Sequence, residues 1–210
     1  MVWFHREYNF PYWFSRTVVK LAFHTIARIT IKDKMNVPDT GGVLLVSNHM
    51  SHLDPPLIGI TCDRKVHFLA KDELFRGLIG WFMCSTGQIR VERGKGGGAV
   101  EVAVESLNRG LCLCIFPEGT RSRTGEMQRP YTGVVVIAAK ANCPVLPVLV
   151  EGTFEMMPPK TKFPRLFKKV RITYGKPFYL SDDERDLDNR EIVRRTAERI
   201  MERIKALSDA

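Results

Sequence analysis

The chain has 210 residues, of which 44% are apolar and 26% are charged, and this composition excludes an intrinsically disordered protein. Its length suits one domain with a sizeable buried core. The formal net charge of +9 at pH 7 predicts an anionic partner, although charge alone leaves nucleic acid, an anionic membrane surface and a phosphorylated substrate open.

The N-terminal region predicts an amphipathic helix at residues 13–29. Basic residues recur there at every fourth position, and apolar residues fill the opposite side. Aromatic residues are dense just before this helix, as is typical of segments at a lipid headgroup boundary. The same apolar stripe would also suit packing on a protein core, and the basic charge favours the membrane surface. We therefore predict a membrane-association segment at residues 1–35 and one larger domain at residues 36–210. The basic positions are Arg16, Lys20, His24 and Arg28.

The rest of the chain alternates between strand-like and helix-like segments. Short apolar or β-branched runs predict strands at 43–47, 66–70, 88–91, 112–116, 145–150 and 170–175. Helical patterns occupy residues 96–110, 132–143 and 190–207. The expected fold class is α/β, a single domain whose mixed, largely buried sheet is flanked by helices and preceded by the amphipathic membrane-surface helix. No apolar run reaches the ~18 residues that a membrane-spanning helix needs.

The cysteines indicate a reducing, cytosolic setting. There are five of them, an odd number without regular spacing, which disfavours a disulfide framework. Cys112 and Cys114 lie two residues apart, but no second pair of ligands follows at a spacing that a metal site would use. We expect them to be buried thiols.

The stretch NHMSHLD at residues 48–54 directly follows the first strand of the larger domain. Loops beyond the carboxyl ends of strands are where α/β folds place reactive groups. Asp54 precedes a proline, which is also typical of a helix N-cap. A metal site built on His49, His52 and Asp54 would need another ligand from a later loop, and the only later histidine is His67.

A second stretch, IFPEGTRSRTGE, occupies residues 115–126 and again lies just beyond a strand. Gly119 permits a tight turn with exposed backbone N–H groups, and Arg121 offers forked donors for a phosphate. Glu118 can orient these donors or a hydroxyl, and GQIRVERG upstream adds Arg93. Together these residues predict a site for a phosphate-bearing substrate. No G-x-S-x-G sequence and no thiol-enzyme signature accompanies them, so a nucleophilic serine or cysteine is not expected.

The motifs NHMSHLD, GQIRVERG, FPEGTRS and VLPV, in this order, resemble those of the glycerolipid acyltransferase family. That family includes the 1-acylglycerol-3-phosphate O-acyltransferases, which make phosphatidic acid. The resemblance spans residues 43–152, and its specific part is N-H-x-x-x-x-D followed by F-P-E-G-T-R-S about seventy residues later. The chain departs from the family pattern in VERG, where an aspartate more often precedes the arginine.

This resemblance implies transfer of an acyl group from an acyl thioester to the free hydroxyl of 1-acyl-glycerol-3-phosphate. The donor would be acyl-CoA or acyl-carrier protein, with no other cofactor and no metal. His49 would act as general base, while Asp54 would hold the imidazole tautomer and stabilise the imidazolium. His52 falls at a variable position of the motif. The implied substrate-binding residues are Arg93, Glu118, Gly119, Thr120 and Arg121, and the supporting residues are Asn48, Pro117 and Ser122.

The implied substrates carry acyl chains, so a monotopic or peripheral enzyme on the cytoplasmic face of a membrane is expected. Residues 160–176, which carry seven basic residues and no acidic one, would then face anionic headgroups. Three alternatives stay open: another lysophospholipid or glycerol-3-phosphate as acceptor, a metal-dependent hydrolase using His49, His52 and Asp54, and a noncatalytic binder. The sequence lacks the basic and aromatic interleaving of RNA-binding proteins, so no nucleic-acid partner is expected.

Overall fold

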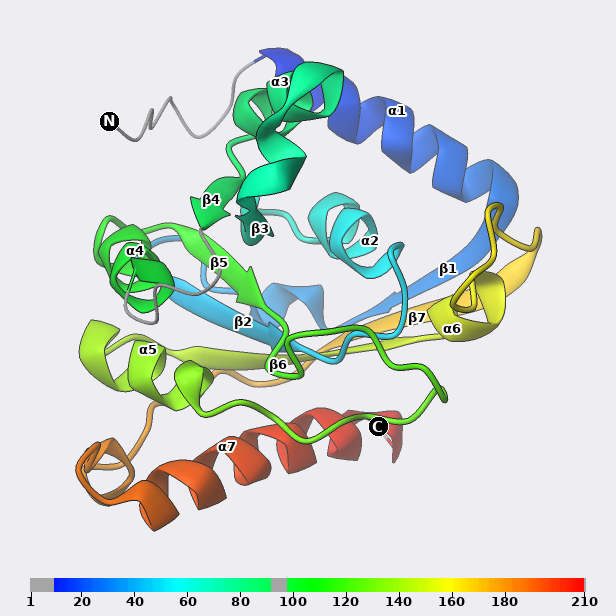
Figure 1. The fold of residues 1–210 in the computed structure, drawn as a ribbon. Coiled ribbons are helices and arrows are strands. Elements are labelled where there is room, and N and C mark those ends of the chain that lie inside the picture. Colours follow the sequence, from blue (N-terminus) through cyan, green and yellow to red (C-terminus); the bar gives the residue numbers. More distant parts are fainter. Residues whose placement is uncertain (1–9, 92–97, 210) are drawn as a thin grey trace.

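The computed structural model describes residues 10–91 and 98–209 (Figure 1). Within these residues, seven strands form one sheet in the order β1-β7-β6-β2-β5-β3-β4. Neighbouring strands are parallel except β6 and β7, so β1 and β7 run against the other five. The strands are β1 (Ala27–Lys32), β2 (Val43–Ser47), β3 (Val66–Lys71), β4 (Ile89–Val91), β5 (Cys112–Ile115), β6 (Val145–Glu151) and β7 (Lys168–Tyr174).

Helices cover both faces of this sheet (Figure 1). The α-helices are α1 (Phe10–Ile26), α2 (Asp54–Thr61), α3 (Gly77–Ser85), α4 (Gly98–Asn108), α5 (Gly133–Ala141), α6 (Thr153–Met156) and α7 (Arg190–Lys205). Short 3₁₀ turns occupy Lys34–Asn36, Asp72–Phe75, Asp183–Arg185 and Ala206–Asp209.

The core lies in two apolar layers, one on each side of the sheet. Phe23 of α1 and Leu57 of α2 pack in one layer, and the other layer holds residues of α4, α5 and α7 such as Ile200. The sheet has apolar neighbours on both faces, which explains why strands such as β2 read as continuous apolar runs rather than as alternating ones. The mixed α/β sheet expected from the sequence is confirmed.

All six predicted strands and the three helices predicted in the larger domain are present, with ends shifted by a few residues. Residues 96 and 97, which the first of these helices was predicted to include, lie outside the described residues. Gly110 follows α4 with a φ of 83°, the left-handed conformation that ends many helices. Cys112 and Cys114 are buried thiols in β5, as expected. Among the described residues, no helix combines the length and hydropathy that crossing a bilayer requires.

The helix predicted at residues 13–29 is wrong at its C-terminal end, and Arg16 departs from the predicted basic face, whereas Lys20 and His24 are exposed. α1 ends at Ile26, and the next residues form β1, which pairs with β7 along its whole length. Arg16 turns inward, where its Nη2 donates to the carbonyl oxygens of Cys62 at 2.6 Å and Ile60 at 3.4 Å. The exposed surface of α1 also carries large apolar side chains. It presents Phe10, Trp13, Phe14, Val18 and Leu21.

Candidate functional site

The loop of residues 48–54 closes around the carboxylate of Asp54. Its Oδ2 accepts hydrogen bonds from His49 Nδ1 at 2.9 Å, from the backbone N–H of Met50 at 2.7 Å and from that of Ser51 at 2.8 Å. The Asp54 side chain is fully buried, whereas 17% of the His49 side chain is exposed. A buried carboxylate on Nδ1 leaves the other ring nitrogen, Nε2, as the one that can exchange a proton with a ligand.

Asp54 does not cap α2, so this interpretation of the sequence is wrong. Asp54 is the first residue of α2, the N-cap position is Leu53, and no side chain caps the helix there. The carboxylate instead accepts from backbone N–H groups upstream of it. Asp54 therefore fixes the turn that presents the imidazole rather than capping the N-terminus of α2.

Sheet register explains why the two sequence motifs meet. β2 and β5 are parallel neighbours, with Val46 opposite Ile115. His49 and Glu118 each lie three residues beyond that pair, so both emerge at the same level of the sheet edge. There Glu118 Oε1 accepts the His49 backbone N–H at 2.8 Å, and the Ser122 N–H donates to the His49 carbonyl at 2.8 Å.

Glu118 is only 2% exposed, and both of its oxygens are engaged. Oε2 accepts the backbone N–H of Gln128 at 2.8 Å. Burial raises the pKa of the Glu118 carboxyl, although the two backbone hydrogen bonds and His49 oppose this rise. The position of Glu118 favours holding the two loops together over direct contact with a substrate.

The supporting residues of the motifs are buried and hydrogen-bond the two site loops to β6 and to neighbouring residues. Asn48 is buried, and its side chain pairs with both the N–H and the carbonyl of Val150 in β6, each at 2.8 Å. Ser122 is buried and its Oγ accepts the Gly125 N–H at 3.0 Å. The carbonyl of Pro117, also buried, accepts the N–H of Tyr131 at 2.8 Å.

Phe116 was not singled out from the sequence, yet its ring stacks on the His49 imidazole. The ring centroids are 4.1 Å apart and the planes differ by 21°. Phe68 of β3 continues the stack at 6.2 Å from Phe116. The sequence does place an aromatic residue directly before P-E-G. The stack, however, depends on the order of β2, β5 and β3 in the sheet, and this order could not be predicted from the sequence.

A cavity of about 740 Å³ opens beside His49. His49, His52, Gly119, Thr120 and Arg121 lie at its polar part, and apolar side chains of α1, α2, α3 and β3 line the remainder. Burial and the nearby Arg121 lower the pKa of His52. This combination of the His49 imidazole, the Arg121 guanidinium and an extended apolar wall suits a ligand with both an anionic group and a hydrocarbon chain.

The backbone conformation at position 119 favours glycine. Its φ is 65°, a conformation that residues with a Cβ rarely adopt. A Cβ there would also lie 2.7 Å from Cε2 of Tyr131, so the ring covers this glycine.

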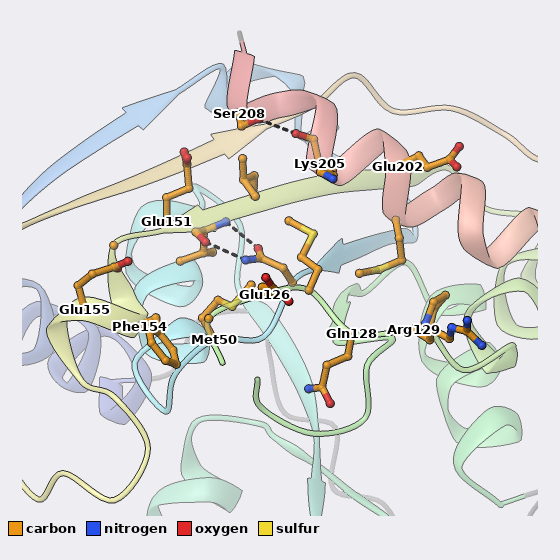
Figure 2. A pocket seen from close by; sticks show the side chains of 18 of the residues that line it. Met50, Glu126, Gln128, Arg129, Glu151, Phe154, Glu155, Glu202, Lys205 and Ser208 are labelled. Carbon is orange, nitrogen blue, oxygen red and sulfur yellow. Dashed lines mark hydrogen bonds between the residues drawn. The ribbon is translucent and has the colours of Figure 1, made fainter. Parts of the chain in front are cut away.

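A second cavity of about 750 Å³ lies on the other side of the same loop, lined by Asn48 and Met50 rather than by His49. Figure 2 shows Met50, residues of the 126–129 segment and residues of α7 around it. Five glutamates and two basic residues line this second cavity. Its charge disfavours a phosphate, whereas the cavity beside His49 carries the Arg121 guanidinium at its polar part.

Arg93 and His67 are the two remaining residues of the sequence-based hypotheses. Arg93 lies outside the described residues. His67 is buried elsewhere, where its Nδ1 contacts the Gly87 carbonyl at 2.6 Å. Across residues 10–91 and 98–209, no group of three histidine, cysteine or acidic residues has an arrangement that would hold a metal ion. The hydrolase alternative, which needed such a group, is unsupported.

Comparison with known proteins agrees with the resemblance of the sequence motifs to those of acyltransferases. A family model described as Acyltransferase matches residues 28–151. A 1-acyl-sn-glycerol-3-phosphate acyltransferase of Bacillus subtilis is 27% identical over 203 residues, which cover 94% of this chain and 97% of the relative. A crystal structure of the 1-acyl-sn-glycerophosphate acyltransferase PlsC from Thermotoga maritima matches with a TM-score of 0.75 and 26% identity, covering 92% of this chain and 77% of that one.

Plastid relatives are longer than this chain. The chloroplastic 1-acyl-sn-glycerol-3-phosphate acyltransferase LPAT1 of Arabidopsis thaliana is 28% identical over 177 residues, covering 81% of this chain but only 49% of the relative. The chain thus spans about half the length of the chloroplast relatives that it matches.

Proposed function

The chain belongs to the acyltransferase family, and on this premise we propose that it transfers an acyl group from an acyl thioester to the free hydroxyl of 1-acyl-glycerol-3-phosphate. The product would be phosphatidic acid. The hydrogen bond between His49 Nδ1 and the buried Asp54, at the polar part of the cavity, is the observation that carries this proposal. The named activity of the Bacillus subtilis relative supports the choice of acceptor.

In the proposed reaction, His49 Nε2 takes the proton of the acceptor hydroxyl as its oxygen attacks the thioester carbonyl carbon. The new C–O bond forms, the carbonyl becomes an oxyanion, and no acyl-enzyme is needed. When the oxyanion collapses, the C–S bond breaks and the leaving sulfur receives the proton from His49. Asp54 keeps the proton of the imidazole on Nδ1 and stabilises the imidazolium that forms between these two steps.

The acceptor would bind through the polar part of the cavity. Arg121 supplies a forked cation for the phosphate, and Thr120 adds a hydroxyl group. Gly119 shapes the turn that carries them, because its N–H donates to the Phe116 carbonyl at 3.0 Å. Arg93 is a further candidate from the family pattern. We assign Glu118 to positioning, because its two oxygens hold the backbone of His49 and of Gln128.

The donor would be acyl-CoA or acyl-carrier protein, without another cofactor. A membrane-peripheral location on the cytoplasmic face is the arrangement that gives both acyl chains access to one cavity. The exposed apolar residues of α1 support this proposal, because five large side chains of one 17-residue helix face away from the core.

The test is acceptor-dependent release of free thiol from a long-chain acyl-CoA, with lysophosphatidate in detergent and with EDTA present. The wild-type protein is expected to release thiol, and His49→Ala is expected to lose at least about 10³-fold in kcat, because the hydroxyl then has no base. His52→Ala, which leaves the pair of His49 and Asp54 in place, is the matched control and should retain transfer. Turnover by His49→Ala at the wild-type rate would remove His49 from the mechanism. Thiol release with glycerol-3-phosphate but not with lysophosphatidate would identify glycerol-3-phosphate as the acceptor.

A further inference from the structure

The loop of residues 158–167, between α6 and β7, presents large apolar side chains to solvent. Phe163 is 81% exposed, Phe167 is 67% exposed and Leu166 is 55% exposed. Isolated exposed apolar residues are ordinary, but three within five positions form a concentrated apolar tip. Such a tip is typical of a surface that contacts another apolar phase.

The same segment is strongly basic. Lys160, Lys162 and Arg165 lie within the loop and Lys168 and Lys169 follow it, and all five are exposed. No acidic residue occurs between Glu155 and Asp182. Cations around an apolar tip match the two layers of a bilayer interface, with anionic headgroups outside and acyl chains inside.

The shape of the loop is fixed by its backbone. Lys160 and Phe167 have φ values of 71° and 58°, a left-handed conformation that costs free energy in residues with a Cβ. The N–H of Arg165 donates to the Met156 carbonyl at 2.7 Å, and the N–H of Phe167 donates to the Ile26 carbonyl at 2.6 Å. The two backbone hydrogen bonds therefore fix the conformation of the loop that carries the exposed apolar tip.

The contact with Ile26 places the loop beside the C-terminal end of α1, where Figure 1 shows it in yellow. Leu21, near that end of α1, is 63% exposed. This backbone contact thus joins the loop to α1, a helix whose surface also exposes apolar side chains.

We propose that the 158–167 loop inserts Phe163, Leu166 and Phe167 into the interface of an anionic bilayer while its basic residues contact lipid phosphates. This inference rests on the proposed function and adds a second membrane contact to that of α1. A contact between two copies of the chain is disfavoured as the occupant, because a symmetric contact would bring five cations of one loop against five of the other.

Insertion can be measured at one residue. Phe163→Cys in a Cys84→Ser background provides a single accessible thiol, because Cys62, Cys112, Cys114 and Cys143 are buried. An environment-sensitive fluorophore on this thiol should shift to shorter wavelength with vesicles containing phosphatidylglycerol, and much less with phosphatidylcholine alone. The matched control is a label at Tyr179→Cys, because Tyr179 is also exposed but adjoins Phe178, which pairs with the opposite end of β6. The proposal would be overturned if the protein bound vesicles while the label at residue 163 showed no greater shift in emission wavelength than the control label.

A second experiment removes the apolar tip without disturbing its backbone. The triple variant Phe163→Ser, Leu166→Ser and Phe167→Asn keeps a residue at position 167 that tolerates positive φ. Its partition onto phosphatidylglycerol vesicles is expected to fall about tenfold or more, with unchanged thermal unfolding. Thiol release with detergent-dispersed lysophosphatidate should continue, which separates this test from that of His49.

Undiminished partition of the folded triple variant would contradict insertion. If the variant instead changed from dimer to monomer in solution while it still bound vesicles, the loop would be an interface between copies. Both results would leave the acyltransfer chemistry untouched.

Discussion

Asp54 is the residue on which the geometry of the 48–54 loop depends most. One buried oxygen orients the imidazole and also holds two backbone N–H groups. Deletion of the whole Asp54 side chain would therefore affect both the orientation of the His49 imidazole and the shape of the loop, and it could not separate these two roles. A substitution of equal size is more informative.

Asp54→Asn keeps the shape but removes the negative charge that stabilises an imidazolium. We expect kcat to fall on the order of 10³-fold or more while the KM for the acceptor changes little. The measurement is steady-state thiol release over a range of lysophosphatidate concentrations, with circular dichroism to show that the fold persists. A rise in KM with kcat preserved would assign Asp54 to acceptor binding instead.

At the scale of elements, α1 is joined to the chemistry through α2, the helix that begins with Asp54. Arg16 of α1 donates to the last carbonyls of α2, where a cation is also favoured by the helix dipole. α1 also lines the cavity, with Tyr12 and Val19 among its wall residues. The inward turn of Arg16 thus fixes one wall of the cavity against the helix that carries the site.

Arg16→Ala should loosen α1 without unfolding the sheet. Hydrogen bonds from a charged donor contribute roughly 1.5–3 kcal/mol, and we expect the opening free energy of α1 to fall by about this amount. Native-state hydrogen exchange of the α1 amides measures it. Lys20→Ala, on the same helix but exposed, is the matched control. Equal exchange in the two variants would mean that Arg16 does not fasten the helix.

Most elements could be predicted from the sequence because their patterns were local. β2 is a continuous apolar run, and α4 ends at a glycine in the expected conformation. β1 was missed because its residues continue the apolar spacing of α1, and only the pairing with β7 makes them a strand. α3 was missed because its nine residues include two glycines, which disfavour a helix locally.

The candidate site divides in the same way. His49, Asp54, Gly119 and Arg121 belong to short motifs, so the sequence alone singles them out as candidates. The buried place of Glu118 and the stack of Phe116 on His49 arise only when β2 and β5 become neighbours. The pairing of two strands that lie far apart in the sequence cannot be predicted from the spacing of residues within one motif.

At the scale of the whole molecule, a buried histidine couples stability to pH. Burial lowers the pKa of His67 from its ordinary 6.5 to about 4, with Lys65 and Arg64 adding to this and the Gly87 carbonyl opposing it. In the unfolded chain His67 would bind a proton near pH 6.5. Between that pH and about 4 the unfolded state therefore binds more protons, and stability must fall as pH falls through this window.

His67→Gln removes this titration while it keeps a side chain that can donate to Gly87. A shift from 6.5 to about 4 corresponds to roughly 3 kcal/mol at about 1.4 kcal/mol per pKa unit. We expect the wild-type free energy of unfolding to decline by up to about that amount more than the variant's between pH 7 and pH 4. Urea unfolding at several pH values measures both slopes.

The comparison isolates His67, because the other shifted groups are common to both proteins. Glu118 acts in the opposite sense: its raised pKa favours the folded state at low pH, and this contribution is lost as pH rises. His52 acts in the same sense as His67 but is less buried. Both contributions cancel in the difference between wild type and variant. Parallel unfolding curves for the two proteins from pH 7 to pH 4 would show that His67 titrates alike in the folded and unfolded chain, and would remove it as the source of acid sensitivity.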